Sequence, residues 1–261
     1  MTIVKHELRR GKTALILWTA SIGFLLSVCI FLFPEIKDEM AGTSKLFASM
    51  GTFTAAFGMD RLNFGTLSGF YAIECGNILG LGGAFYVAQC AASMLCKEEK
   101  EGTAEFLLTH PIRRARIVSE KLLAILLQTT AMSLGIYALS IATIAAIGEA
   151  IPWKEITLLH TAYWLLQLEL AGVCFGLSAF LRRASAGVGI GLATMFYFLN
   201  LIANISETAA FLKYITPFAF CDGADVITNG RLDGRLVAIG LTIGGVGIAI
   251  AYGKYTKKDI L

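Results

Sequence analysis

Residues 122–148 read LLAILLQTTAMSLGIYALSIATIAAIG, a run of 27 residues without a single charged side chain. A helix rises about 1.5 Å per residue, so about 20 apolar residues are enough to cross the hydrocarbon core of a bilayer. The stretch lacks the period-two alternation of a barrel strand. Because every backbone amide inside lipid must find a partner within its own segment, the stretch predicts a transmembrane helix.

Five further apolar runs of similar length accompany this stretch. They cover residues 14–33, 70–96, 156–181, 184–206 and 236–253. The composition agrees, because 56% of the residues are hydrophobic and 16% are charged, against about 25% charged in a soluble domain. The first run is too long for a cleaved signal peptide, and no small-x-small cleavage site follows it. We therefore predict an all-α membrane protein with six transmembrane helices in a single transmembrane domain over residues 1–261.

Basic residues are divided unevenly between the segments that join these runs. If the N-terminus lies inside, the inner segments hold 15 of the 22 Lys and Arg residues and the outer segments hold 7. With the acidic residues counted, the inner segments carry a net charge of +8 and the outer segments −3. Since cytoplasmic loops are enriched in Lys and Arg, this asymmetry predicts that the N-terminus and the C-terminus both lie in the cytoplasm.

The sequence lacks residue patterns for catalysis or metal binding. Its six cysteines form no CxxC or CxxH pair and its three histidines are dispersed, so neither a zinc site nor a disulfide framework is predicted. Gly11-Lys12-Thr13 is a fragment of a phosphate-binding loop, but His6 stands where that motif needs glycine. We predict no catalytic residue, no metal, no cofactor bound by this chain and no nucleic-acid partner.

The one long inner loop, residues 97–121, combines charged and apolar side chains. It begins with the charge run Lys97-Glu98-Glu99-Lys100-Glu101, and residues 102–111 then read GTAEFLLTHP. Thr103 can cap a short helix with Glu105 in its first turn, and Pro111 suits the first position of a following helix. We predict two short helices joined at a kink, and their apolar and charged groups favour contact with a protein partner.

Two outer segments, residues 34–69 and 207–235, are too apolar for plain linkers. Each is predicted either as an amphipathic or re-entrant element on the outer surface or as an ordinary capping loop.

The inner loop and three other segments share an ordered set of residues with one protein family. In the loop the set is Glu98, Glu99, Gly102, Thr103, Glu105, Leu107, Leu108, Pro111, Arg113, Arg114, Ile117 and Lys121. Elsewhere it includes residues 5–10 (KHELRR), residues 214–218 (YITPF) and residues 257–260 (KKDI). In this order they resemble the permease subunits of bacterial type-2 ATP-binding-cassette (ABC) exporters, and the resemblance runs the length of the chain.

The resemblance implies a location in the bacterial cytoplasmic membrane and a division of labour between chains. Two permease subunits, alike or different, pair above two cytosolic ATPase subunits, which bind the ATP and Mg. The inner loop acts as a coupling helix seated in the ATPase, and a short amphipathic N-terminal helix containing Lys5, Glu7, Arg9 and Arg10 braces the contact. The implied coupling residues are Glu98, Glu99, Gly102, Thr103, Glu105, Phe106, Leu107, Leu108, Pro111, Arg113 and Arg114.

Two carboxylates lie inside the predicted spans. Glu169 stands in the middle of the run 156–181, where a charge costs about 2.5–3.5 kcal/mol, so it is expected to face protein or water or to be protonated. It either lines a substrate path or forms a buried hydrogen bond to a neighbouring helix, and Gly172 and Gly176 share its face. Glu74 lies near the outer end of its span and is expected at the interface.

The sequence leaves other functions open. An amphipathic peptide, an antibiotic or a drug is the cargo that mostly apolar walls suggest. One alternative is a proton-coupled secondary transporter that uses Glu169, although six spans without inverted halves fit common carriers poorly. Another is a membrane immunity or sensor protein that transports nothing.

Overall fold

The structure is a computed structural model that describes residues 2–49, 51–104, 109, 112–181 and 186–258, with the backbone alone for residues 40–49 and Phe53. No strand occurs in this part of the chain. Within it, five helices are long and apolar enough to cross a membrane. They are α1 (Thr2–Ser49), α7 (Arg114–Ala146), α8 (Trp153–Ser178), α9 (Ala186–Ile205) and α11 (Gly234–Lys257). The protein is a multi-pass membrane protein.

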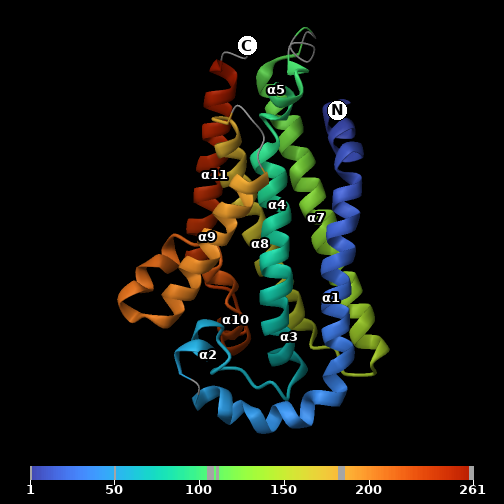
Figure 1. Ribbon diagram of the computed structural model, residues 1–261, viewed down its shortest axis with the longest axis vertical. Helices are drawn as coiled ribbons and strands as arrows, with labels where there is room; N and C mark the ends of the chain where they lie inside the picture. The colour runs from blue at the N-terminus through green and yellow to red at the C-terminus, as the bar shows by residue number, and fades with distance from the viewer. Residues whose placement is uncertain (1, 50, 105–108, 110–111, 182–185, 259–261) are drawn as a thin grey trace.

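The short helices lie toward the two ends of these long helices. α5 (Lys97–Glu101) lies where α1 begins and α11 finishes, which we name the terminal end (Figure 1). α2 (Thr52–Ala56) and α10 (Gly223–Asn229) lie toward the opposite end, the distal end (Figure 1). Two 3-10 helices, η2 (Glu207–Tyr214) and η3 (Ala219–Cys221), connect α9 to α10.

The predicted run 70–96 is divided into three helical pieces. α3 (Leu67–Cys75) leads into the π-helical segment η1 (Gly76–Gly80), and α4 (Leu81–Ser93) follows along the same direction (Figure 1). A Cβ atom on Gly76 or Gly80 would lie 3.0 or 2.9 Å from the side chain of Tyr163. The absence of side chains here lets the Tyr163 ring approach the helix where the i→i+4 ladder is widened by one residue.

The first helix differs from its prediction at both ends. A separate short helix was expected around residues 5–10, and residues 34–69 were expected as an amphipathic or re-entrant element or as a capping loop. Instead, α1 continues without a break from Thr2 to Ser49. Proline inside a helix removes one backbone hydrogen bond and bends the axis, and Pro34 stands inside α1. Figure 1 shows α1 turning at the distal end to run across the bottom of the molecule.

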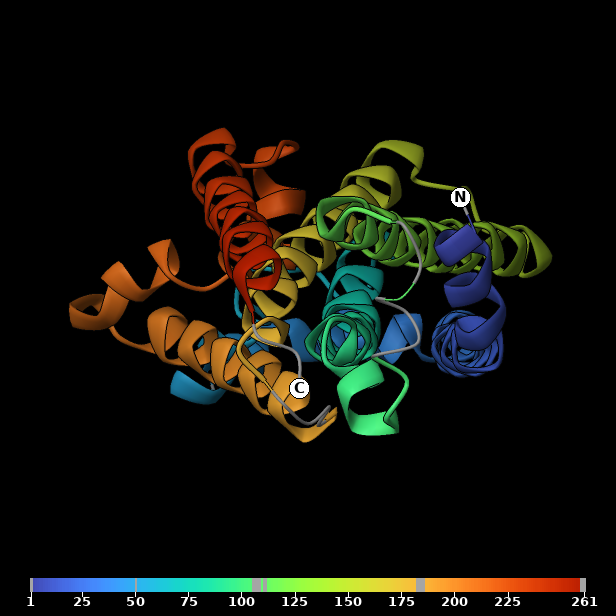
Figure 2. The same ribbon diagram turned by 90° about the horizontal axis from the view of Figure 1, so that it is seen from above.

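Small residues set the packing between the long helices. Viewed from the terminal end, α4 and α8 lie in the middle, with α1 and α7 on one side and α9 and α11 on the other (Figure 2). A Cβ on Gly172 of α8 would lie 2.4 Å from the carbonyl oxygen of Gly244 on α11, and one on Gly176 would lie 2.6 Å from that of Gly247. The backbones of α8 and α11 therefore touch along a glycine seam, as small-xxx-small patterns permit.

Candidate functional site

At the terminal end, α5 is held by a set of ion pairs that we name the terminal cluster. Four of its five residues each pair with a different residue on another element. The pairs are Lys97 with Glu7, Glu98 with Lys121, Glu99 with Lys258 and Glu101 with Arg10. These partners come from α1, α7 and the residue directly after α11, so one turn and a half of helix contacts three long helices.

Lys121 is the most deeply buried member of the terminal cluster, with an exposed fraction of 0%. Its ammonium nitrogen lies 2.5 Å from Glu98 Oε2 and donates to the carbonyl oxygen of Met94 at 2.6 Å. A buried ammonium group without partners costs several kcal/mol, so these contacts are what allow a charge at this position. The base of α5 is thereby joined to the first turns of α7.

Lys258 makes the equivalent connection at the end of α11. Its Nζ donates to Glu99 Oε1 at 2.6 Å and to the carbonyl oxygen of Leu181 at 2.9 Å. The carbonyl oxygen of Lys258 in turn accepts a hydrogen bond from Arg114 Nη1 at 2.5 Å. The end of α11, the end of α8 and the start of α7 are therefore tied to α5 through one residue.

The start of α1 is held against α7 by backbone contacts. The amide nitrogens of Ile3 and Val4 donate to Glu120 Oε2 at 3.0 and 3.4 Å, which satisfies donors that a helix N-terminus leaves unpaired. Gln128 Nε2 donates to the backbone oxygen of Glu7 at 3.2 Å. Glu7, buried and paired with Lys97, thus sits where α1, α5 and α7 meet.

The structure brings together part of the predicted coupling set. Glu98 and Glu99 lie in the terminal cluster, and so do Glu7 and Arg10 of the predicted N-terminal helix, while Lys5 and Arg9 are exposed. Arg10 donates a hydrogen bond to Glu101 and lowers the pKa of that carboxyl. Outside the described residues lie Glu105, Phe106, Leu107, Leu108 and Pro111.

Two predictions about this loop need correction. The charge run was expected to precede the first short helix, but residues 97–101 are themselves helical, with Glu98 and Glu99 in the first turn and Lys100 in the last, as the helix dipole favours. Gly102 ends α5 in the left-handed conformation, with φ of 69°, and Thr103 follows. The next helix was expected to begin at Pro111, but α7 begins at Arg114 with Arg113 as its N-cap.

The two predicted intramembrane carboxylates lie apart from the terminal cluster. Glu169 is 2% exposed, and its Oε2 has no hydrogen-bond partner among the described residues. It faces the glycine seam, because a Cβ on Gly240 of α11 would lie 2.1 Å from that oxygen. Glu74 is half-buried, and its Oε2 lies 3.6 Å from Cys29 Sγ on α1.

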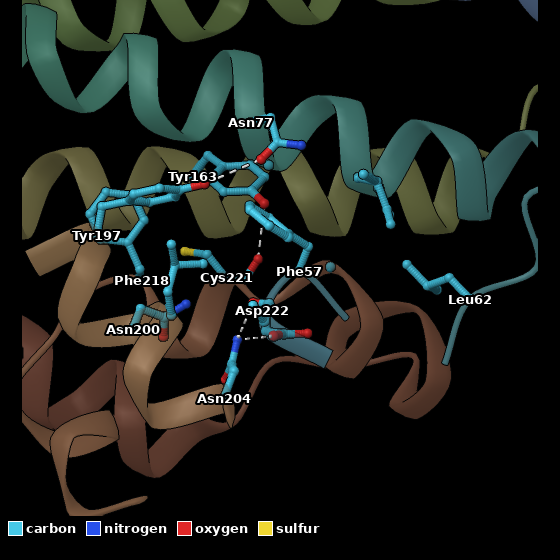
Figure 3. Close-up of a pocket in the computed structure, with 16 residues that line it drawn as sticks. Phe57, Leu62, Asn77, Tyr163, Tyr197, Asn200, Asn204, Phe218, Cys221 and Asp222 are labelled. Carbon is cyan, nitrogen blue, oxygen red and sulfur yellow. Dashed lines mark hydrogen bonds between the residues drawn. The ribbon is translucent and has the colours of Figure 1, made fainter. Parts of the chain in front are cut away.

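A second polar site, which the sequence did not predict, lies at the distal end. Figure 3 shows the side chains that line a cavity there, among them residues of η1, α8, α9 and the η3–α10 segment. The volume of this cavity is about 60 Å³. Its polar lining residues are Asn77, Tyr163, Tyr197, Asn200, Asn204 and Asp222. The sequence offered no signal for them, because each stands alone in an apolar run or in an irregular segment. We name this space the distal cavity.

Among the fully buried polar side-chain atoms that line the distal cavity in the described residues, one has no hydrogen-bond partner. Asn204 Nδ2 donates to Asp222 Oδ2 at 3.0 Å and to the backbone oxygen of Ala56 at 3.2 Å. Tyr197 OH donates to Asn77 Oδ1 at 3.3 Å (Figure 3). Asn200 is 8% exposed, and in the part of the chain that is described its Oδ1 has no hydrogen-bond partner.

Asp222 orders the floor of the distal cavity. Its Oδ1 accepts hydrogen bonds from the amides of Ala224 and Asp225, so it is the N-cap of α10. Arg61 lies between two carboxylates, with Nη2 at 3.2 Å from Asp222 Oδ1 and Nη1 at 2.5 Å from Asp225 Oδ1. Arg61 is therefore shared between two acids, of which Asp222 lines the cavity and Asp225 lies outside its lining.

The long apolar helices define the class as an integral membrane protein. A family model described as ABC-2 family transporter protein matches residues 1–232, so the chain belongs to the ABC-2 transporter family. A search of curated proteins found no match. At the level of the family, such chains are membrane transport components without an ATPase site of their own.

Proposed function

We propose that this chain is the permease subunit of an ATP-driven exporter and that the 97–121 loop receives the motion of a separate ATPase. The observation that carries this proposal is the terminal cluster, in which α5 pairs with α1, α7 and the end of α11. A displacement of the loop would therefore act on three long helices together. Membership of the ABC-2 transporter family supports a partnership with ATPase subunits.

We also propose that the chain crosses the membrane six times, with the terminal end in the cytoplasm. α1 begins and α11 finishes at the same end of the molecule, which requires an even number of crossings (Figure 1). The five long helices are an odd number, so in this proposal the succession of α3, η1 and α4 forms the sixth crossing. The excess of Lys and Arg in the segments at the terminal end favours the cytoplasm for that side.

In this mechanism the chain transmits motion from the ATPase subunits to its own helices, and it does not itself hydrolyse ATP. Two copies, or this chain and a related one, would pair, and two ATPase subunits holding ATP and Mg would dock beneath them. Closure of the ATPases would press on the 97–121 loop, and the ion pairs of α5 would move α1, α7 and α11 with it. The cargo we favour is an amphipathic molecule, because the long helices present mostly apolar walls.

A charge-swap experiment tests the coupling role of the terminal cluster. Glu7 is buried and pairs with the half-buried Lys97, so Glu7→Lys should place two cations together and break the link between α5 and α1. The chain reconstituted in liposomes with its ATPase should then lose about tenfold of the stimulation that the permease gives to ATP hydrolysis, which corresponds to about 1.4 kcal/mol. Adding Lys97→Glu should restore much of that stimulation.

The control for the charge swap is Lys12→Glu, which changes the charge of α1 by the same amount at an exposed residue. Its stimulation of ATP hydrolysis should stay at the level of the original chain. The pairing argument would be contradicted if stimulation of ATP hydrolysis fell equally in Glu7→Lys, in Glu7→Lys combined with Lys97→Glu, and in Lys12→Glu. Stimulation that is unchanged by Glu7→Lys would contradict the coupling role of α5.

Variants in the loop itself test where the ATPase docks. Leu107→Asp and Glu105→Lys are predicted to uncouple ATP hydrolysis from transport while the helical bundle stays folded. The measurement is co-purification of the ATPase together with the melting temperature of the isolated chain. Uptake driven by a pH gradient without any ATPase, and lost in Glu169→Gln, would instead support the proton-coupled alternative.

A further inference from the structure

The distal cavity combines three features that point to a ligand. Its size is about 60 Å³, whereas a pocket for a whole drug-sized molecule has about 300–1,000 Å³. About 10–15 Å³ of such space is enough to hold one water, so the cavity suits a few waters or one small head group. The occupant of this cavity is therefore a group and not an entire amphipathic molecule.

Asn200 indicates whether the bound group is a hydrogen-bond donor or an acceptor. Buried polar atoms are almost always hydrogen-bonded, and leaving one unpaired costs about 1–3 kcal/mol. Asn200 Oδ1 is such an atom: it is buried, it belongs to a residue lining the cavity, and no described residue donates to it. An amide oxygen is an acceptor, so the missing partner carries an N–H or O–H donor.

The surrounding charges favour a cationic donor. Asp222 is the acidic residue of the lining, Arg61 is shared between it and Asp225 outside the lining, and the segments predicted to face outward carry a net charge of −3. Two aromatic side chains are also part of the lining, since Tyr197 and Phe218 both line the cavity in an edge-to-face contact with ring centroids 5.4 Å apart. Aromatic rings attract ammonium groups through their quadrupole.

We propose that the distal cavity binds the protonated primary amine of an amphipathic molecule, with Asn200 Oδ1 accepting one of its N–H hydrogen bonds. Binding of the amine does not depend on the proposed function, but the description of that amine as cargo rests on it. The remaining N–H groups would face Asp222 and the aromatic rings, and the apolar part of the molecule would extend out of the cavity. An uncharged alcohol would keep one hydrogen bond and lose the electrostatic attraction.

The test measures binding to the chain alone, so its failure is separate from a failure of ATPase coupling. The chain in nanodiscs of zwitterionic lipid is titrated by calorimetry with hexylammonium, hexanol and hexanoate, and the heat from empty nanodiscs is subtracted. Hexylammonium should bind the original chain at least about tenfold more tightly than hexanol, and hexanoate should not bind. This comparison needs no variant and therefore no assumption about folding.

Variants of Asn200 identify the acceptor. Asn200→Leu keeps the branched shape of the side chain, at a larger volume, and removes the oxygen, so hexylammonium affinity should fall about tenfold or more, the range expected for a hydrogen bond to a charged group. Asn200→Asp adds a carboxylate at the same place and should raise that affinity. Thr194→Val on the same helix is the control, because the Thr194 hydroxyl bonds only its own helix at Ile190 within the described structure.

Four outcomes would overturn the proposal. They are equal binding of hexanol and hexylammonium, affinity for hexylammonium that is unchanged in Asn200→Leu, no binding of any probe, and binding of Na⁺ alone that Asn200→Leu abolishes. The third outcome would mean that the cavity holds water only, and the fourth would mean a site for a monovalent metal ion.

Discussion

The two ends of the molecule differ in whether a buried polar group has a hydrogen-bond partner. At the terminal end, the ammonium group of Lys121 has an exposed fraction of 0% and is satisfied by Glu98 and by the backbone oxygen of Met94. At the distal end, Asn200 Oδ1 is equally hidden and has no described partner. A fully paired cluster fixes the relative positions of its helices, whereas an unpaired acceptor is available to something that arrives from outside.

The largest effect should come from breaking the terminal cluster. Lys121→Met leaves Glu98 without its buried partner, and removing one member of a buried ion pair costs about 3–5 kcal/mol. Thermal unfolding in detergent should show a correspondingly large fall in melting temperature. Adding Glu98→Gln to Lys121→Met should recover part of the lost melting temperature. Lys12→Met, at an exposed position of α1, should leave the melting temperature unchanged.

The seam between the two ends should give the next largest effect. Gly172→Ala places a methyl group 2.4 Å from the carbonyl oxygen of Gly244, and overpacking of this kind costs about 1–3 kcal/mol. Gly245→Ala is the matched control, because its Cβ meets nothing within 4 Å and alanine favours the helix. Equal melting temperatures for the two variants would contradict the close contact of α8 and α11.

Two asparagines four residues apart on α9 sharpen the comparison within the distal cavity. Asn204→Leu removes the donor to Asp222 and to Ala56 and should cost about 1–3 kcal/mol in the free energy of unfolding. Asn200→Leu removes an unpaired oxygen and should be neutral or slightly stabilising. The same loss of stability in both variants, measured by thermal unfolding in ligand-free buffer, would show that Asn200 has a structural partner.

The smallest effect is expected at the exposed edge of the terminal cluster. Arg10 lowers the pKa of Glu101, so the pair stabilises the folded state above the unfolded pKa of a Glu carboxyl and loses this contribution as the pH falls through the folded pKa. Both side chains are more than a third exposed, so screening limits the contribution to about 1 kcal/mol or less. Arg10→Gln should therefore lower the melting temperature slightly at pH 7 and not at pH 2.

The sequence predicted the membrane class and the approximate places of the long helices, because long uncharged runs have few physical alternatives. It did not predict that α1 continues past Pro34 or that the run 70–96 contains η1. A proline in a long helix bends it without ending it, and the π-helical turn lies against Tyr163, which is remote in the sequence. These features are set by tertiary contacts and not by local composition.

The candidate sites were predicted unequally for a similar reason. Glu98, Glu99, Glu7 and Arg10 were expected near a partner surface, and the structure joins them through pairs that link residues far apart in the chain. Lys121 was part of the family signature without an assigned partner. The distal cavity was not predicted, since Asn77, Asn200 and Asp222 come from three separate segments and only the fold brings them together.

The π-helical turn η1 has a consequence for the register of its helix. Each residue in a helix advances the side-chain direction by about 100° around the axis. One extra residue in the turn therefore rotates the side chains of α3 relative to those of α4. Deleting Ile78 would restore a regular α-helix but would swing α3 around its axis, carrying Glu74 and Tyr71 away from their neighbours on α1 and α7. The added residue thus works as an angular spacer that sets the direction in which each half of the helix faces.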